Sequence, residues 1–196
     1  MGSMPSGSAS PLRSCEELLA ARPGILFSLL DSAREPGIPD LLKESSLRHE
    51  SLYVGDVGQE LEDVAPYLVE LRRDSALLTQ LAHRAWGLSW GLFLTSDAGF
   101  EDVHRHLRRF LKVETEDGRQ LYFRFYDPRA LRIFLPTCTP DQLTEFFGPI
   151  REFVMEAESP AQALVFSRDG FALIRKEVEL STNVVGRSPS ARAHER

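Results

Sequence analysis

Short apolar segments, each bounded by helix caps or turn residues, follow one another along most of the chain. The longest apolar stretch covers residues 85–94 and is interrupted by Ser89. It is shorter than the roughly 20 residues that a transmembrane helix needs. Because helix and strand signals alternate early and hairpin signals come late, we predict an α+β (α/β) fold. A mixed β-sheet with flanking helices is expected, and it ends in a C-terminal β-hairpin.

The clearest helix signals are caps. Ser14 with Glu17 forms a capping-box pattern, and Thr139 with Gln142 forms a second one. Asp127 followed by Pro128 reads as an N-cap with proline at the first helical position. Helices are therefore predicted to begin at these three caps, the first to stop before Pro23, the second at Gly148-Pro149, and the third by Pro136. Further helices are predicted over 38–44, 75–86 (with Gly87 as its C-terminal cap) and 100–111.

Strands are predicted where apolar or β-branched runs are bounded by turn residues. Two Asp-Gly pairs, Asp117-Gly118 and Asp169-Gly170, indicate β-hairpins. The predicted strands are 25–30, 51–55, 67–71, 91–95, 112–115, 120–126, 161–166 and 171–180.

The domain organisation follows from composition. We expect residues 1–12 and 181–196 to be disordered because they offer little apolar surface to offset the entropy of ordering. Residues 13–158 are expected to form the main domain, with the hairpin 159–180 packed on it. The net charge is −6, from 23 Lys and Arg against 29 Asp and Glu. That sign disfavours nucleic acid as a partner, and no secretory signal precedes the domain, so we expect a cytoplasmic protein with no membrane partner.

Catalytic motifs are scarce. Gly87-Leu-Ser-Trp-Gly91 matches the G-x-S-x-G pattern of serine hydrolases, in which a strand turns into a helix. Here a helix is predicted before the motif and a strand after it, so hydrolysis through Ser89 is only a minor alternative. His104 and His106 are predicted on opposite sides of one helix and so do not share a metal. Cys138 is interpreted as an inert thiol. We expect no enzyme activity, no catalytic residue, no metal and no cofactor.

The most unusual segment is residues 122–129, Tyr-Phe-Arg-Phe-Tyr-Asp-Pro-Arg. On a continued strand, Phe123 and Phe125 would face the core, while Tyr122, Arg124 and Tyr126 would share the other face. A guanidinium between two phenol rings is held flat by cation–π stacking. Two interpretations stay open: a brace between strand and helix, or a protein-binding surface, since Tyr and Arg dominate binding hot spots.

The chain resembles the adaptor or effector-chaperone family of bacterial type VI secretion, often called Tap or Tec, over about residues 26–153. The resemblance rests on an ordered series of short motifs. They are Leu26-Phe-Ser-Leu-Leu-Asp31, Leu52-Tyr-Val-Gly55, Ala65-Pro-Tyr-Leu-Val69, Trp86-Gly87, Leu92-Phe-Leu-Thr-Ser96, His106-Leu-Arg-Arg-Phe110, Arg124-Phe-Tyr-Asp-Pro128 with Leu131, and Phe147-Gly-Pro149. The chain is short after residue 158, where relatives often carry a further lobe.

The resemblance implies a non-catalytic protein that binds one secreted effector toxin in the cytoplasm and helps to place it on the VgrG spike. The expected partners are that effector and the spike. As a hypothesis, the partner-binding surface comprises Tyr53, Tyr122, Arg124, Tyr126 and Arg129. Asp127, Pro128, Gly148 and Pro149 are expected to be structural motif residues. An immunity-type protein that binds a toxin is the alternative within the binding class.

Overall fold

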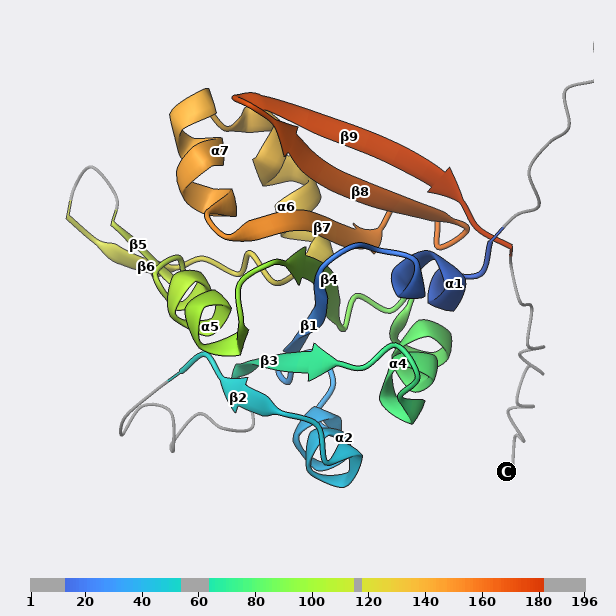
Figure 1. The fold of residues 1–196 in the computed structure, drawn as a ribbon. Helices are drawn as coiled ribbons and strands as arrows, with labels where there is room; N and C mark the ends of the chain where they lie inside the picture. Colours follow the sequence, from blue (N-terminus) through green and yellow to red (C-terminus); the bar gives the residue numbers. More distant parts are fainter. Residues whose placement is uncertain (1–12, 54–63, 115–117, 182–196) are drawn as a thin grey trace, which may run out of the picture.

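The computed structural model describes residues 13–53, 64–114 and 118–181. Its centre is a seven-stranded sheet in the order β2-β3-β1-β4-β7-β8-β9, and a separate two-stranded ribbon pairs β5 with β6 (Figure 1). The strands are β1 (Ile25–Asp31), β2 (His49–Ser51), β3 (Pro66–Leu71), β4 (Gly91–Ser96), β5 (Lys112–Glu114), β6 (Gln120–Tyr122), β7 (Ile150–Glu156), β8 (Gln162–Asp169) and β9 (Ala172–Glu179).

Helices cover both faces of the sheet. They are α1 (Cys15–Ala20), α2 (Ile38–Ser45), α4 (Ala76–Gln80), α5 (Phe100–Arg108), α6 (Pro128–Phe134) and α7 (Pro140–Phe147). One core layer joins α5, α6 and α7 to the sheet, and the other joins α1, α2 and α4 to the opposite face (Figure 1). Successive side chains of a strand enter opposite layers, as Leu26 and Phe27 of β1 do. The α+β class predicted from the sequence is confirmed.

The local signals in the sequence locate most elements correctly. Both capping boxes are present, at Ser14 and Thr139, and the Asp127 side chain caps α6 with Pro128 at its first turn. The hairpin of β8 and β9 encloses Asp169-Gly170. The helix predicted over 75–86 is also present, but α4 continues into a π-helical turn at Leu81–Ala85. Gly87 follows at φ +82°, which suits the predicted glycine after a helix end.

Four predictions require correction. The expected mixed sheet is antiparallel in every strand pairing of the described residues. The strand expected at 51–55 is instead β2, which ends at Ser51, and residues 54–55 lie outside the described part. The helix expected at 100–111 ends at Arg108, because the chain then tightens into i→i+3 bonds such as Phe110 N–H to the Leu107 carbonyl. The strand expected at 120–126 ends at Tyr122, and a turn follows that joins the Asp127 N–H to the Arg124 carbonyl.

The strand β7 was not predicted. It pairs with β4 on one side and β8 on the other, so it links the first half of the sheet to the C-terminal hairpin. Its sequence mixes Arg151, Glu152 and Glu156 with apolar residues, which hides the apolar run that marks a buried strand. Of the predicted disordered ends, 1–12 and 181–196, the structure describes only Ser181, whose backbone N–H donates to the Arg13 carbonyl. The other residues of both ends and the turn residues 115–117 lie outside the described part.

The strand β9 forms one edge of the sheet, and β2 forms the other. The side chains of β9 are mostly exposed, and four of its eight residues are charged. The two ends of the described chain meet near it, where the Ser181 N–H donates to the Arg13 carbonyl at 2.9 Å. None of the described helices is long and apolar enough to cross a bilayer.

Candidate functional site: arginines and aromatic rings around helix α6

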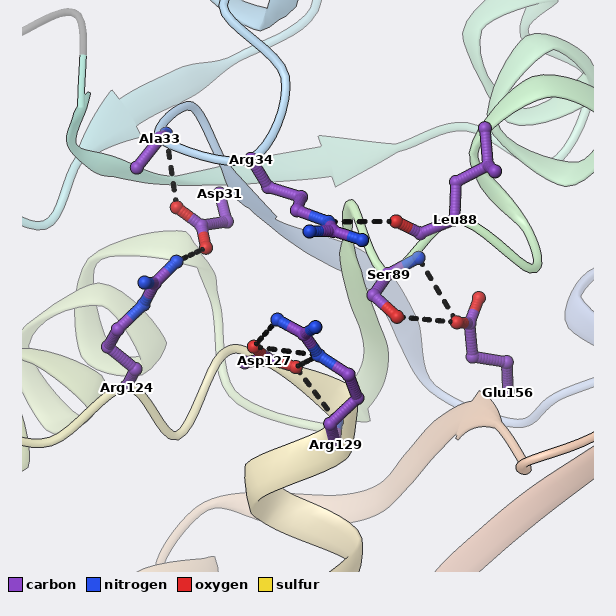
Figure 2. A network of polar contacts seen from close by, with 9 residues as sticks. All are labelled: Asp31, Ala33, Arg34, Leu88, Ser89, Arg124, Asp127, Arg129 and Glu156. Carbon is purple, nitrogen blue, oxygen red and sulfur yellow. Dashed lines mark hydrogen bonds and ion pairs between the residues drawn. The ribbon is translucent and has the colours of Figure 1, made fainter.

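Three buried acidic or hydroxyl side chains come together at one end of the central strands. Asp31 ends β1, Ser89 lies just before β4, and Glu156 ends β7. Because β1 and β7 both run antiparallel to β4, the C-terminal ends of β1 and β7 lie beside the start of β4. Figure 2 shows how arginine side chains from three other segments reach this same end of the sheet. We call these residues the sheet-end cluster, which comprises Asp31, Arg34, Ser89, Arg124, Asp127, Arg129 and Glu156.

The first pair in the cluster is Asp31 with Arg124. The Asp31 side chain is only 1% exposed, accepts a hydrogen bond from the Ala33 N–H at 3.1 Å and forms an ion pair with the Arg124 guanidinium. The Arg124 side chain is 47% exposed. The hydrogen bond to Asp31 raises the pKa of Arg124 above its ordinary value. Arg124 therefore stays charged while it presents part of its guanidinium to solvent.

The second pair, Asp127 with Arg129, lies within the first turn of α6. The Asp127 carboxylate accepts from the Arg129 backbone N–H at 2.9 Å and from its Nη2 at 2.6 Å. Burial acts to raise the pKa of Asp127, but the hydrogen bonds from Arg129 outweigh it and hold that pKa below its usual range. Asp127 is therefore ionised at neutral pH, and the Arg129 side chain is 48% exposed beside it.

Glu156 organises the helix-to-strand corner that contains the G-x-S-x-G motif. Its carboxylate accepts from the Gly87 N–H, from the Ser89 N–H at 3.1 Å and from the Ser89 hydroxyl at 2.8 Å. Ser89 adopts a left-handed backbone conformation, φ 56°, which this carboxylate stabilises. In the described part of the chain no histidine hydrogen-bonds to Ser89. The order is helix, turn, strand, the reverse of a nucleophile elbow.

Arg34 is the third arginine of the cluster. Its Nε donates to the Leu88 carbonyl at 3.2 Å, which ties the segment after β1 to the same corner (Figure 2). Its backbone N–H donates to the Asp31 carbonyl at 3.0 Å. Within residues 13–53, 64–114 and 118–181, Arg34 forms no ion pair with a carboxylate.

The tyrosines of the predicted binding surface separate into two environments. Tyr126 is buried, and its pKa is raised above the ordinary value by burial first and then by the neighbouring Tyr53 hydroxyl. Tyr122 is 53% exposed and packs edge-on against Tyr53 at 5.9 Å between ring centroids. The predicted stack of Arg124 between two phenol rings is therefore half correct. Arg124 lies 5.9 Å from the ring of Tyr126, while Tyr122 faces Lys112.

The chain turns after Tyr122, so the predicted alternation of faces fails. Phe125 and Tyr126 are both buried, and Phe123 is half-buried. Phe123 instead lies edge-on to Phe134 of α6, at 4.7 Å. Together these changes place Phe123 and Arg124, adjacent in sequence, in two different surface features.

The second feature is an open apolar groove of about 220 Å³, which we call the aromatic groove. Its lining consists of Phe110, Phe123, Phe134, Gln142, Glu145 and Phe146. The rings of Phe110 and Phe146 pack edge-on with centroids 5.0 Å apart, so the groove has walls of packed aromatic rings. Ile133, one residue before Phe134, is 69% exposed. Apolar clefts with adjacent exposed apolar residues mark sites of interaction.

The two histidines of α5 are both buried. His104 Nε2 lies 2.9 Å from the Ser51 carbonyl, and His106 Nε2 lies 2.9 Å from the Phe146 carbonyl. Burial lowers the pKa of His106, so the imidazole is neutral and donates to that carbonyl. The two rings thus lie against different backbone carbonyls, and no set of three or more potential ligands is arranged for a metal in the described residues.

Two other predicted structural residues follow α7. Gly148 has φ +48°, and a Cβ there would lie 2.3 Å from the His106 ring, so glycine is required. The Pro149 carbonyl accepts from the Ser96 hydroxyl at 2.7 Å. Cys138 donates weakly to the Phe134 carbonyl, and burial raises its pKa, which makes the thiol unreactive.

Sequence reasoning missed Asp31, Arg34 and Glu156 as members of the site. Asp31 ends a continuous apolar run, and a carboxylate in that position needs a cation or backbone donors when the strand is buried. That signal was available from the sequence. No sequence signal indicated Glu156, because β7 itself was not predicted.

Comparison with known proteins gives a family and little else. No curated protein and no solved structure matches the chain significantly. One family model, described as Domain of unknown function (DUF4123), matches residues 26–145, well over half of the chain. That range includes six members of the sheet-end cluster, Asp31, Arg34, Ser89, Arg124, Asp127 and Arg129, and the walls of the aromatic groove up to Glu145. The chain belongs to the DUF4123 family.

Proposed function

We propose that this protein is a type VI secretion adaptor-chaperone that binds a cognate effector in the cytoplasm and promotes its loading onto the VgrG spike. The aromatic groove carries the proposal. A chaperone of this kind has to cover an apolar effector segment, and a rigid groove of phenylalanine rings offers such a segment a matching surface. The ordered motifs that resemble type VI adaptors overlap the family match over residues 26–145, which supports the same role.

The polar surroundings of the groove also suit a protein partner. Glu145 and Gln142 lie on its α7 side, and Glu145 pairs with Arg109 at 3.2 Å. Tyr122 and Ile133, each next in sequence to a phenylalanine of the groove lining, are also exposed. An apolar centre with a polar rim is the usual anatomy of protein interfaces.

The proposed role is non-catalytic. Ser89, the one motif residue typical of hydrolases, donates its hydroxyl to a buried carboxylate instead of to a general base of the histidine type. A serine-reactive fluorophosphonate probe applied to the purified chain is expected to leave Ser89 unlabelled. Labelling that disappears in a Ser89→Ala variant would favour the hydrolase alternative.

The direct test is co-purification of the chain with the toxin encoded beside a spike gene in its native genome. Phe123→Gln places an amide in the groove and is expected to reduce effector recovery at least tenfold. Phe171→Gln is the matched control, because Phe171 is 69% exposed at the β8–β9 turn and is not part of the groove lining. Circular dichroism melting of both variants verifies the fold. Equal recovery with both folded variants would contradict the role of the groove.

Co-expression separates a loader from an immunity protein. A loader is expected to bind the toxin without protecting cells from its activity, and its deletion is expected to abolish secretion of that toxin. Protection of cells with normal secretion would favour the immunity alternative.

A further inference from the structure

The sheet-end cluster has opposite charges at different depths. The carboxylates of Asp31, Asp127 and Glu156 are buried, whereas the side chains of Arg124 and Arg129 are nearly half exposed and Arg34 is also exposed. A partner that approaches this end of the sheet therefore meets guanidinium groups first. The carboxylates behind them fix the orientation of two of those groups, so little entropy is lost when they bind a ligand.

Donor capacity remains at all three guanidinium groups. Each guanidinium carries five N–H donors. Arg34 uses its Nε on the Leu88 carbonyl, Arg124 uses its Nη2 on Asp31, and Arg129 uses its Nε and Nη2 on Asp127. The Nη groups of Arg34 thus remain for a ligand, and its positive charge has no carboxylate partner among the described residues. Arg34 is the strongest candidate for direct contact with an anion.

Common neighbours place the three arginines in one electrostatic environment. The Arg124 guanidinium bonds the Asp31 side chain, and the backbone N–H of Arg34 donates to the Asp31 carbonyl at 3.0 Å. Arg129 lies within the field of both Asp31 and Glu156. Figure 2 shows all three side chains around this one polar region. The neighbouring Glu35 accepts from the Gly37 N–H at 3.2 Å within its own loop, so it is already engaged.

We propose that Arg34, Arg124 and Arg129 bind the carboxylate groups of an acidic segment in the protein partner, with Arg34 as the principal contact. This inference rests on the proposed function, in which the chain binds another polypeptide. Carboxylate suits the planar fork of arginine, which binds it through two parallel hydrogen bonds. A nucleic acid backbone suits the site less well, because the chain has a net charge of −6.

The test uses the full chain without any effector. A short fluorescein-labelled Glu-rich peptide and its Gln-rich counterpart are titrated with the protein at low ionic strength, and anisotropy is measured. The acidic peptide is expected to bind at least tenfold more tightly, and added salt should weaken it. Arg34→Gln should reduce that affinity about tenfold, and Arg34→Lys should reduce it less, because lysine keeps the charge without the fork.

The matched control is Arg175→Gln on β9, where Arg175 is also about half exposed and ion-paired, with Glu177. It is expected to leave peptide affinity unchanged. The inference is overturned by equal binding of the two peptides, by no detectable binding, by an Arg34→Gln variant that binds normally, or by stronger binding of a single-stranded oligonucleotide of equal charge. Effector co-purification is measured separately, so retained effector binding with a failed peptide titration would overturn this inference alone.

Discussion

The two faces of the central sheet bury different kinds of side chain. The layer under α5, α6 and α7, which we call the aromatic face, contains many phenylalanines. They are Phe27, Phe100, Phe125, Phe146, Phe147, Phe153 and Phe166. The layer under α1, α2 and α4, the aliphatic face, contains mainly Leu, Val and Ala, with Phe93 as its one fully buried phenylalanine among the described residues.

This difference explains why the proposed binding groove lies where it does. Flat rings meet preferentially edge to face, as Phe147 and Phe153 do at an interplanar angle of 73°. Such rings leave wedge-shaped spaces where the layer reaches solvent, and the aromatic groove is one of them. A hollow of about 260 Å³ between α2 and α4 on the aliphatic side has polar side chains such as Glu44, Ser45 and Gln80 in its lining. The comparison suggests that one face supplies recognition while the other supplies packing.

The largest expected effect compares two neighbours on β7 that point to opposite faces. Phe153→Ala on the aromatic face is expected to lower the free energy of unfolding by about 3–5 kcal/mol. Val154→Ala on the aliphatic face should cost about 2 kcal/mol, because less surface is lost. Urea denaturation of both variants measures the difference. Equal losses would show that the two faces do not differ in how their packing contributes to stability.

Next in size is the loss of the buried acceptor at the corner before β4. Glu156→Leu leaves the Gly87 N–H, the Ser89 N–H and the Ser89 hydroxyl without their acceptor. We expect a loss of about 2–3 kcal/mol in the free energy of unfolding, and a smaller loss for Glu156→Gln, which keeps one oxygen. A neutral result for Glu156→Leu in chemical denaturation would mean that this corner does not depend on the carboxylate.

A smaller effect should depend on pH and should come from the aromatic face. Burial lowers the pKa of His106 in the folded state, so protons bind the unfolded chain more readily. The resulting stability is fully present above the ordinary histidine pKa of about 6.5 and is lost as the pH falls through the lower folded value. His106→Gln should cost about 1 kcal/mol at pH 8, through the lost bond to the Phe146 carbonyl, and should flatten the decline between pH 7 and 5. Parallel slopes of unfolding free energy against pH for both proteins would contradict this assignment.

The smallest effect is the loss of a helix N-cap, and it should lower the free energy of unfolding by a similar amount on both faces. Asp127 caps α6 on the aromatic face, and Ser14 caps α1 on the aliphatic face. Replacing either residue with alanine should cost about 1 kcal/mol, because each exposes backbone donors at a helix start. The loss of stability caused by Asp127→Ala should also disappear at low pH. The folded pKa of Asp127 is lowered, so its contribution is present above the usual carboxyl pKa and disappears as the pH falls through the folded value. Thermal melts at pH 7 and pH 3 test both statements.

The sequence predicted those parts of the fold that depend on neighbouring residues. A capping box such as Ser14 with Glu17 satisfies backbone donors within a single turn, so it needs no tertiary information. The Asp169-Gly170 turn likewise specifies its hairpin locally. By contrast, β7 owes its burial to the strands on both of its sides, and its charged residues concealed that burial.

The candidate site was predictable only in part for a similar reason. Arg124 and Arg129 stood out because aromatic and proline neighbours surround them in the sequence. Their partners did not, because Asp31 and Arg124 are 93 positions apart in the chain and meet only in the tertiary fold. The turn after Tyr122 also depends on this pairing and on Asp127, so the strand expected through Tyr126 was too long.

The charged edge strand has a consequence for assembly. Half of the side chains of β9 are ionised, with Arg175 and Lys176 followed by Glu177 and Glu179. A second molecule that extended the sheet along this edge would have to desolvate these charged side chains. The opposite edge strand, β2, is only three residues long, so it offers few backbone groups for pairing with another strand. The charged edge of β9 and the short edge of β2 therefore both disfavour extension of the sheet by a second molecule.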